Sequence, residues 1–313
     1  MKNMFSIIIA GFGIVCFNPL TAAEPWSDVD IDLQDLGAQN ISSEPTAGPW
    51  NIELLGDAVG NANVRCPGDS HLNFATAQLD LSVIYYYDPC YTEGLTAGIN
   101  YMWTRLGWDA NPYFSQENFS TATVSFGAFS QRLPNWTWRG QLSINFDNLE
   151  YWTFADYMNY DMLVWGRYEI RKDIGVHIGF LALTGMKIDR VYPVIGIDWT
   201  YNCNWKLSLV FPVDISLIYT ITPAWNISLA GRFLNQRHRV HEDQTLPKAL
   251  WFYTTGGGEL AVNYSPSKRF KANIHAGANL GGHLKIANRH YQHGERYRLE
   301  SAPYAGAEID LNF

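Results

Sequence analysis

Basic and imidazole side chains cluster in two segments near the end of the chain, residues 235–255 and 281–302, which together hold five of the eight histidines. Imidazoles beside carboxylates can bind a divalent metal, and arginines bind phosphate through paired hydrogen bonds. Both segments are expected to be loops, and no metal site and no cofactor is predicted. They form either an anion-contacting surface or ordinary solvated loops. The anion-contact candidates are Arg237, His238, Arg239, His241, Arg289, His290, His293, Arg296 and Arg298.

The segments that would position these side chains alternate between apolar and polar residues. Near the end of the chain, Ala305, Ala307, Ile309 and Leu311 alternate with polar or small residues. Successive side chains of a strand point to opposite faces, so this strand has one apolar face and one polar face. The chain ends on its apolar row, with Phe313.

This ending resembles the final strand of the outer-membrane β-barrels of Gram-negative-type bacteria, which commonly closes on a lipid-facing phenylalanine. The resemblance implies that Phe313 is an insertion signal read by the barrel-insertion machinery. It also implies contacts with outer-membrane lipid and, at the external loops, with lipopolysaccharide phosphates. The alternative is an edge strand of a secreted β-sandwich.

The first 49 residues predict export. Residues 1–23 have a basic start, an apolar run and small residues at Thr21-Ala22-Ala23, as expected for a signal peptide. The apolar run is too short for a membrane-spanning helix. Residues 24–49 are rich in proline and aspartate and predict a periplasmic acidic tail or, alternatively, a plug segment inside a barrel. Residues 50–313 would then form an integral outer-membrane β-barrel.

The composition agrees with a barrel. Aromatic residues make up 15% of the chain and charged residues 17%. Both fractions suit strands that have one lipid-facing side, one polar side and aromatic girdles at the membrane interfaces. The formal net charge of -8 argues against a nucleic-acid partner. After signal removal Cys66, Cys90 and Cys203 remain, an odd number that predicts neither a disulfide framework nor a zinc motif.

Alternation and turn residues from Trp50 onward predict an all-β fold, an antiparallel transmembrane up-and-down β-barrel of 14 strands, with 12 as the alternative. Short turns rich in Pro, Asn and Asp alternate with generally longer polar connections, as short periplasmic turns alternate with longer external loops. An even strand number places both ends of the barrel on the periplasmic side. The weakest segments are the first hairpin and Phe211-Pro212-Val213, where the apolar row continues through the proline.

The polar rows would carry charges of both signs into the lumen. Buried charges must be paired or hydrated, so the lumen is either a narrow water-filled path with a modest cation preference or a salt-bridged, filled interior. The predicted lumen-facing residues are Asp80, Arg139, Asp147, Asp161, Arg167, Glu169, His177, Asp198, Lys206, Asp214, Arg232, Glu259, Lys271, His275, Glu308 and Asp310.

The function predicted from this fold analogy and from the mixed polar lumen is a narrow passive, porin-like channel for small solutes. The alternative is a surface-interaction or structural outer-membrane protein with a filled lumen. A lipid-modifying enzyme is a third class, but outer-membrane phospholipase barrels place a Ser two residues after a strand His. Here the residue two positions after His177 is Gly179, and the residue two positions after His275 is Gly277. No nucleophile therefore stands beside a base, and no catalytic residue is predicted.

Overall fold

The computed structural model describes residues 48–66, 68–109, 111–147 and 154–313. The predicted signal peptide and residues 24–47 of the predicted tail lie outside these ranges. The described residues form one short helix, α3 (Phe154–Tyr157), and a set of strands. The strands are β1 (Trp50–Cys66), β2 (Gly68–Tyr86), β3 (Glu93–Trp108), β4 (Asn118–Ser130), β5 (Trp136–Asp147), β6 (Met158–Arg171), β7 (Ile174–Gly185), β8 (Ile188–Thr200), β9 (Trp205–Phe211), β10 (Asp214–Thr222), β11 (Trp225–Arg239), β12 (Leu250–Ser267), β13 (Phe270–Ala287), β14 (Glu295–Leu299) and β15 (Ala302–Asn312).

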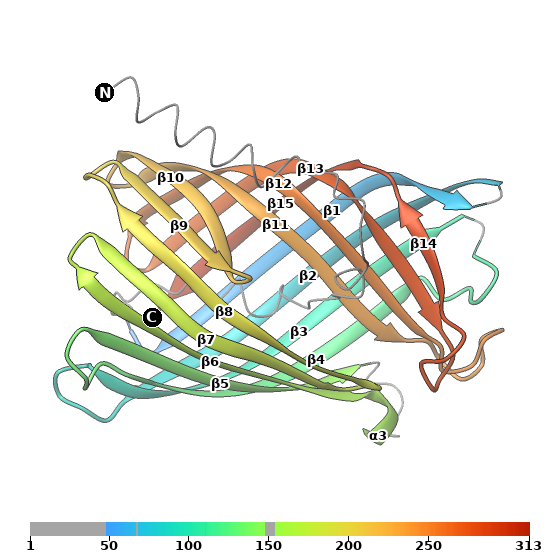
Figure 1. Cartoon of the computed structure of the whole chain (residues 1–313), viewed down its shortest axis with the longest axis horizontal. Helices are drawn as coiled ribbons and strands as arrows, with labels where there is room; N and C mark the ends of the chain where they lie inside the picture. The colour runs from blue at the N-terminus through green and yellow to red at the C-terminus, as the bar shows by residue number, and fades with distance from the viewer. Residues whose placement is uncertain (1–47, 67, 110, 148–153) are drawn as a thin grey trace, which may run out of the picture. The chain divides into compact units, whose positions relative to one another are not determined.

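The strands close into a barrel (Figure 1). Each strand from β2 to β14 pairs antiparallel with the preceding strand, and β15 pairs with β13 and with β1, which completes the ring. Both β14 and β15 pair with β1 and β13, so they are one strand interrupted at Glu300 and Ser301. The ring therefore has fourteen strand positions, and the predicted all-β, fourteen-strand antiparallel barrel is confirmed.

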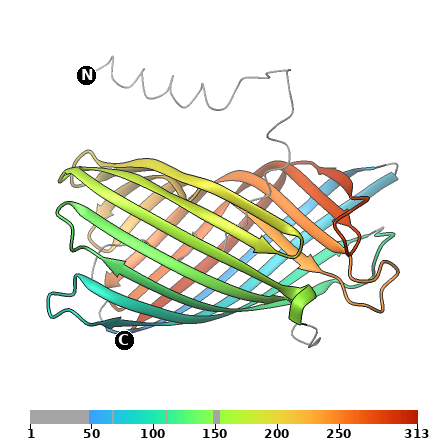
Figure 2. The same ribbon diagram turned by 60° about the horizontal axis from the view of Figure 1, so that its bottom comes forward.

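Both ends of the barrel sequence meet at one end of the ring, called the terminal end below. Trp50 N donates to Phe313 O at 3.2 Å, and Phe313 N donates to Trp50 O at 2.8 Å. The opposite end is called the distal end. The distal connection 240–249, in orange, projects at the end away from the C-terminus (Figure 2).

Short polar turns join the strands at the terminal end, as the sequence predicts. Asp88 accepts hydrogen bonds from the backbone N–H groups of Cys90 at 3.2 Å and Thr92 at 3.1 Å. The hydrogen bond from the Thr92 side chain, together with these two, holds the pKa of Asp88 below its usual value. Asn135 takes the left-handed backbone conformation in the turn before β5.

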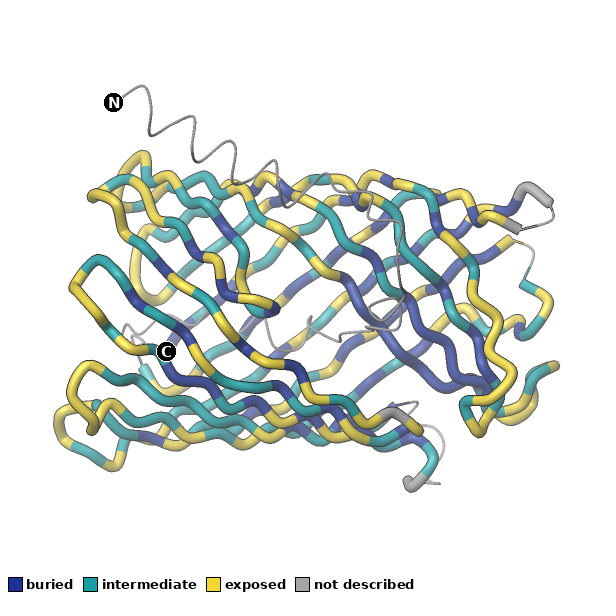
Figure 3. The backbone as a smooth tube through the Cα atoms, in the orientation of Figure 1, coloured by how far each residue is buried: buried dark blue, intermediate teal, exposed yellow. Residues whose placement is uncertain are grey.

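The barrel wall alternates in exposure along each strand (Figure 3). The outward row carries large exposed apolar side chains, and the inward row carries most of the polar and charged ones. This follows from the period of two in a strand, which lets one wall face two different environments. The outward row includes Leu54, Ile99, Phe126, Leu142, Ile170, Ile195, Phe211, Ile221, Leu229, Leu260 and Ile309.

The distal ends of several strands extend further than predicted, so the predicted loop boundaries 235–255 and 281–302 are wrong. β11 continues to Arg239, β12 starts at Leu250 and β13 continues to Ala287. The distal connections at Met186–Lys187 and at Pro212–Val213 are tight. The sequence does not reveal these extensions because many distal strand residues are buried on both faces, which removes the hydropathy alternation.

The weak segment at Phe211-Pro212-Val213 is a hairpin connection, and the strands on either side of it are the shortest of the unbroken ones. β9 has 7 residues and β10 has 9, so the wall is low at this point. Pairing of β8 with β9 begins at Ile195, and pairing of β11 with β10 ends at Gly231. The distal half of β11 therefore pairs only with β12. Its other edge has no neighbouring strand to keep it in the plane of the wall.

Candidate functional site

The distal half of the β11–β12 hairpin closes the distal end of the barrel. This segment, residues 234–255, is called the cap. Residues 234–240 and 249–253 of the cap are all buried, whereas a strand in the wall shows burial on one face only. Burial on both faces means that the hairpin packs against other parts of the barrel on each side.

One side of the cap packs on the inner face of β2 and β4. The rings of Tyr253 and Phe74 stack with centroids 4.4 Å apart, and the Trp251 and Phe119 rings meet edge to face at 5.0 Å. These side chains belong to an apolar core that also contains Leu106 of β3 and side chains of β1, β13, β14 and β15. The cap is therefore part of the apolar core at the distal end of the lumen.

Charged contacts tie the cap to β5 and β6 across the lumen. Arg237 Nη2 lies 3.3 Å from Asp161 Oδ1 of β6, and His238 Nδ1 lies 2.6 Å from Asp147 Oδ1 of β5. The backbone N–H of Arg239 donates to the other oxygen of Asp147. Neither β5 nor β6 pairs with β11, so these bonds are made only because the hairpin bends inward.

These contacts overturn the sequence-based placement of three anion-contact candidates. Arg237, His238 and Arg239 were predicted on a solvated loop, but they are only 6%, 0% and 1% exposed. They lie on a strand, and two carboxylates that the sequence also predicted to be inward already hold them. Burying the two guanidinium groups is possible here because each has a carboxylate or carbonyl partner.

A second set of contacts holds the cap connection at the distal rim. Lys248 Nζ lies 2.5 Å from Glu242 Oε1 and 3.3 Å from Asp156 Oδ2 of α3. The hydrogen bond to Glu242, then that to Asp156, raises the pKa of Lys248. Burial alone would raise the pKa of Asp156, but the Lys248 hydrogen bond and nearby positive charges lower it overall. Burial raises the pKa of Tyr157, under the Arg239 guanidinium, to about 12.

Glycines allow the inward bend at the base of the cap. Gly256, Gly257 and Gly258 follow the cap on β12, and the β12–β13 register shifts between Thr255 and Gly257. A Cβ on Gly257 would lie 2.3 Å from the Ala278 carbonyl oxygen, so only glycine permits this close approach. On β13, Gly281 lies at the same level and has a φ of +105°. The triple glycine is the sequence signal for this bend.

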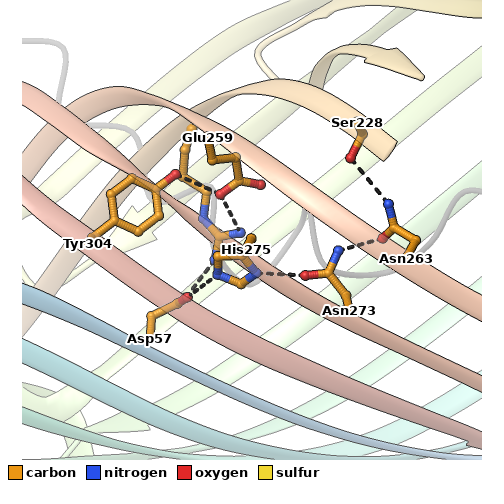
Figure 4. A network of polar contacts seen from close by, with 8 residues as sticks. Asp57, Ser228, Glu259, Asn263, Asn273, His275 and Tyr304 are labelled. Carbon is orange, nitrogen blue, oxygen red and sulfur yellow. Dashed lines mark hydrogen bonds and ion pairs between the residues drawn. The ribbon is translucent and has the colours of Figure 1, made fainter. Parts of the chain in front are cut away.

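Below the cap, the lumen holds a connected polar network (Figure 4). Arg232 of β11 reaches Asp57 of β1 at 2.5 Å, and His275 of β13 reaches the other oxygen of Asp57 at 2.6 Å. Tyr304 donates to Glu259 at 2.6 Å. From His275 the chain of hydrogen bonds continues through Asn273 to Asn263 and Ser228.

A separate network lies on the inner face of β6, β7 and β8. Arg167 donates to both oxygens of Asp198 at 2.8 Å, a bidentate arrangement. His177 contacts Asp198 at 2.5 Å through Nε2 and receives a hydrogen bond from Trp165 at 2.9 Å through Nδ1. Paired charges of this kind line the lumen wall without leaving an isolated buried ion.

The predicted lumen residues lie on the inward rows, with different degrees of burial. The buried ones are Asp80, Asp147, Asp161, His177, Asp198, Glu259, His275 and Asp310. The half-buried ones are Arg139, Arg167, Glu169, Arg232, Lys271 and Glu308, and the exposed ones are Lys206 and Asp214.

Two further lumen carboxylates, Glu53 and Asp57, were not found from the sequence. Glu53 lies between the outward Ile52 and Leu54 of the first predicted strand, and extending that strand by three residues would have placed Asp57 inward as well.

The other anion-contact candidates remain near the surface at the distal end. His241 is half-buried, and the exposed ones are Arg289, His290, His293, Arg296 and Arg298. Within the described residues, no group of three or more His, Cys, Asp or Glu side chains is arranged to hold a metal ion. Phe313 is exposed at the terminal end, and Cys90 and Cys203 are exposed free thiols.

Comparison with known proteins assigns a family to this arrangement. Residues 135–312, more than half of the chain, match the model of a family described as a domain of unknown function, DUF6268. The chain belongs to this family. The DUF6268 match runs from the start of β5 to the end of β15, so it includes the cap and the Arg167–Asp198 network. Glu53 and Asp57 on β1 lie outside it.

Similar whole chains come from Chlamydia. An uncharacterised protein of Chlamydia trachomatis is 20% identical over 274 residues, covering 82% of this chain and 84% of the relative. One from Chlamydia pneumoniae is 23% identical over 211 residues, covering 66% of this chain and 65% of the relative.

Solved structures that align with the DUF6268 chain include two from Pseudomonas putida. An outer membrane channel of strain F1 has 9% identity and a TM-score of 0.49, covering 87% of this chain and 98% of the other. The toluene transporter TodX has 9% identity and a TM-score of 0.45, covering 85% and 90%. The barrel assignment itself rests on the strand pairing of this chain.

Proposed function

We propose that this protein is an integral barrel of the bacterial outer membrane and acts as a passive channel for small solutes, with the cap as its gate. The observation that carries the proposal is the division of one wall into an apolar outer belt and a charged inner row, closed at one end by a bent hairpin. Such a wall suits lipid outside and water or polar solute inside.

The dimensions of the wall support a membrane location. A tilted strand of about 9–11 residues spans a bilayer, and β10 has 9 residues with an outward row of apolar side chains. Longer strands such as β2, with 19 residues, extend beyond this belt at the distal end. Exposed Trp50, Tyr85, Trp205 and Trp225 lie near the terminal end, where an aromatic girdle is expected.

The two ends then have different roles. The terminal end would face the periplasm, because both ends of the barrel sequence lie there, and the distal end would face outward. Polar networks line the wall between the terminal end and the cap. A solute that enters from the periplasmic side would pass them before it reaches the cap. The β11 edge of the cap pairs with no wall strand, whereas its β12 half is paired with β13, so the cap would move about the β12–β13 pair without breaking the β5–β8 wall.

Single-channel recording in a planar bilayer tests the channel. Refolded mature protein, and a variant lacking residues 24–49, should give salt-dependent openings that are brief because the cap is closed at rest. A variant with a loosened cap, Trp251→Ala, should stay open longer. Folding is checked by heat-modifiable gel mobility. Silence of all three proteins in their folded form would contradict the proposal.

A second role, contact with lipid phosphate at the outer surface, is supported by cross-strand basic pairs near the distal rim. Arg65 lies opposite Arg298, and Lys285 opposite Arg296. Like charges in register repel; Glu300 relieves part of the repulsion at the first pair by binding Arg65 at 3.0 Å, and a phosphate would relieve more by accepting hydrogen bonds from the basic side chains. Lipopolysaccharide should co-purify less with Arg298→Gln than with Arg132→Gln at the other end of the barrel. Equal amounts in the two variants would exclude this role.

We also propose that the exposed Phe313 is the signal for barrel insertion. Deleting it should leave the protein refoldable in detergent but reduce its assembly by the insertion machinery in outer-membrane preparations. Normal assembly of the shortened chain would exclude this role.

A further inference from the structure

A row of inward side chains at the terminal end of the lumen is dominated by carboxylates. It crosses five neighbouring strands in direct register: Asn100 on β3, Asp80 on β2, Glu53 on β1, Asp310 on β15 and Lys271 on β13. Directly opposed residues have Cβ atoms about 4.5–5.5 Å apart. Three acidic side chains therefore stand side by side on one wall of the lumen.

The two outer carboxylates of this row have hydrogen-bond donors. Asp310 accepts from Asn51 at 2.5 Å and from Asn312 at 2.9 Å, and Lys271 Nζ lies 3.6 Å from its other oxygen. Asp80 is hydrogen-bonded by the side chains of Asn100 and Ser82. Both carboxylates are thus held in place by neighbouring amide, hydroxyl or ammonium groups.

The central carboxylate is different. Glu53 is 8% exposed, and its Oε1 has no hydrogen-bond partner among the described residues. The charged groups around it are Glu308, Asp80, Asp310 and Lys271. Among these neighbours of Glu53, only Lys271 is positively charged. A buried carboxylate without a donor is costly, and a positive charge beside it would remove that cost.

We propose that this acidic row binds a monovalent cation and makes the lumen selective for cations. The inference rests on the proposed channel function and names the class of solute, an alkali cation or the ammonium group of a small organic solute. The arrangement is not a chelating metal site, because the described residues contain no suitable metal-binding group. The cation would instead be held loosely by charge, which allows passage.

The position of the row suits this role. Glu53, Asp80 and Asp310 lie near the terminal end, on the same wall as the Asp57–Arg232–His275 network and closer to the opening. A solute coming from the periplasmic side would meet the acidic row before it meets the paired charges deeper in the lumen. A single unpaired carboxylate at an entrance affects which ions enter more than paired charges do.

Reversal potential in a KCl gradient is the first test, with Glu53→Gln as the variant because glutamine keeps the shape of the side chain. The wild type should prefer K⁺ to Cl⁻, and Glu53→Gln should lower this permeability ratio by about fivefold, the effect of one unit charge about 4 Å away in water. Glu117→Gln removes the same charge from an exposed ion pair at the distal rim and should leave the ratio unchanged. An unchanged ratio in Glu53→Gln would overturn the proposal while leaving the channel intact.

A second test does not depend on conduction. The thermal unfolding midpoint in detergent is compared at constant ionic strength in KCl, methylammonium chloride and N-methylglucamine chloride, whose cation is too bulky for the row. K⁺ or methylammonium should raise the midpoint of the wild type and of Glu117→Gln, but not of Glu53→Gln or Asp80→Asn. A response to methylammonium alone would identify the solute ammonium as the ligand.

Stabilisation by small cations in a protein that shows no conductance would support the site and reject the channel. A midpoint that changes with pH but not with the cation would mean that protons, not a cation, neutralise the row, and would overturn the proposal.

Discussion

Truncating Trp251 should open the cap without unfolding the barrel. This indole is fully buried in the apolar core and contacts the rings of Phe119 and His238, at 5.0 and 4.9 Å between centroids. Replacing a buried Trp by Ala usually costs about 3 to 5 kcal/mol. The indole N–H has no hydrogen-bond partner among the described residues, so removing this buried donor offsets the loss of folding free energy by about 1 kcal/mol. The expected net cost for Trp251→Ala is about 2 to 4 kcal/mol.

This cost falls on the closed cap, because the wall pairs of β1 to β8 are untouched. The channel should therefore be open for a larger fraction of the time, measured by single-channel recording, while heat-modifiable mobility shows a folded barrel. Trp251→Phe keeps one aromatic ring in the core while removing the unpaired N–H and the second ring of the indole, so its open time should lie closer to the wild type than that of Trp251→Ala. If folded Trp251→Ala shows the open time of the wild type, the cap is not the barrier and the reasoning is refuted.

Three further predictions concern the wall, the contact between Lys248 and Asp156 at the distal rim, and the lumen network. Ile144→Arg on the outward face should lower the free energy of unfolding in lipid by about 2 to 4 kcal/mol, and Gln141→Arg on the inward face should lower it by less. Urea titrations measure both losses, and equal losses would contradict the face assignment. The lowered pKa of Asp156 means that its hold on Lys248 is complete above about pH 4 and is lost as the pH falls through the lower folded-state pKa. Channel opening should accordingly increase in acid, and a Lys248→Met variant should lack this pH response; a response that persists would place the titrating group elsewhere. Arg232→Met leaves two lumen carboxylates without their cation and should cost about 3 to 5 kcal/mol in thermal or urea unfolding, whereas a loss below 1 kcal/mol would mean that water replaces the guanidinium.

The wall of the barrel was largely predictable. Hydropathy alternation located β5 and the turns at Asp88 and Asn135, because one lipid-type face and one polar face give a period of two. The same rule failed at the distal ends of β11, β12 and β13. There both faces are buried, so residues such as Arg237 and Trp251 follow one another without the pattern that marks a half-exposed strand.

The sequence by itself determined the class of fold, the number of strand positions and the inward or outward direction of most side chains, since each depends on neighbouring residues in the chain. Tertiary structure alone decided which inward groups meet. Glu53 joins Asp310 only because β1 pairs with β15, and Arg237 meets Asp161 only because the hairpin bends at its glycines. Such contacts join residues far apart in the chain, and their partners are set by ring closure and by packing in the lumen, which no local pattern records.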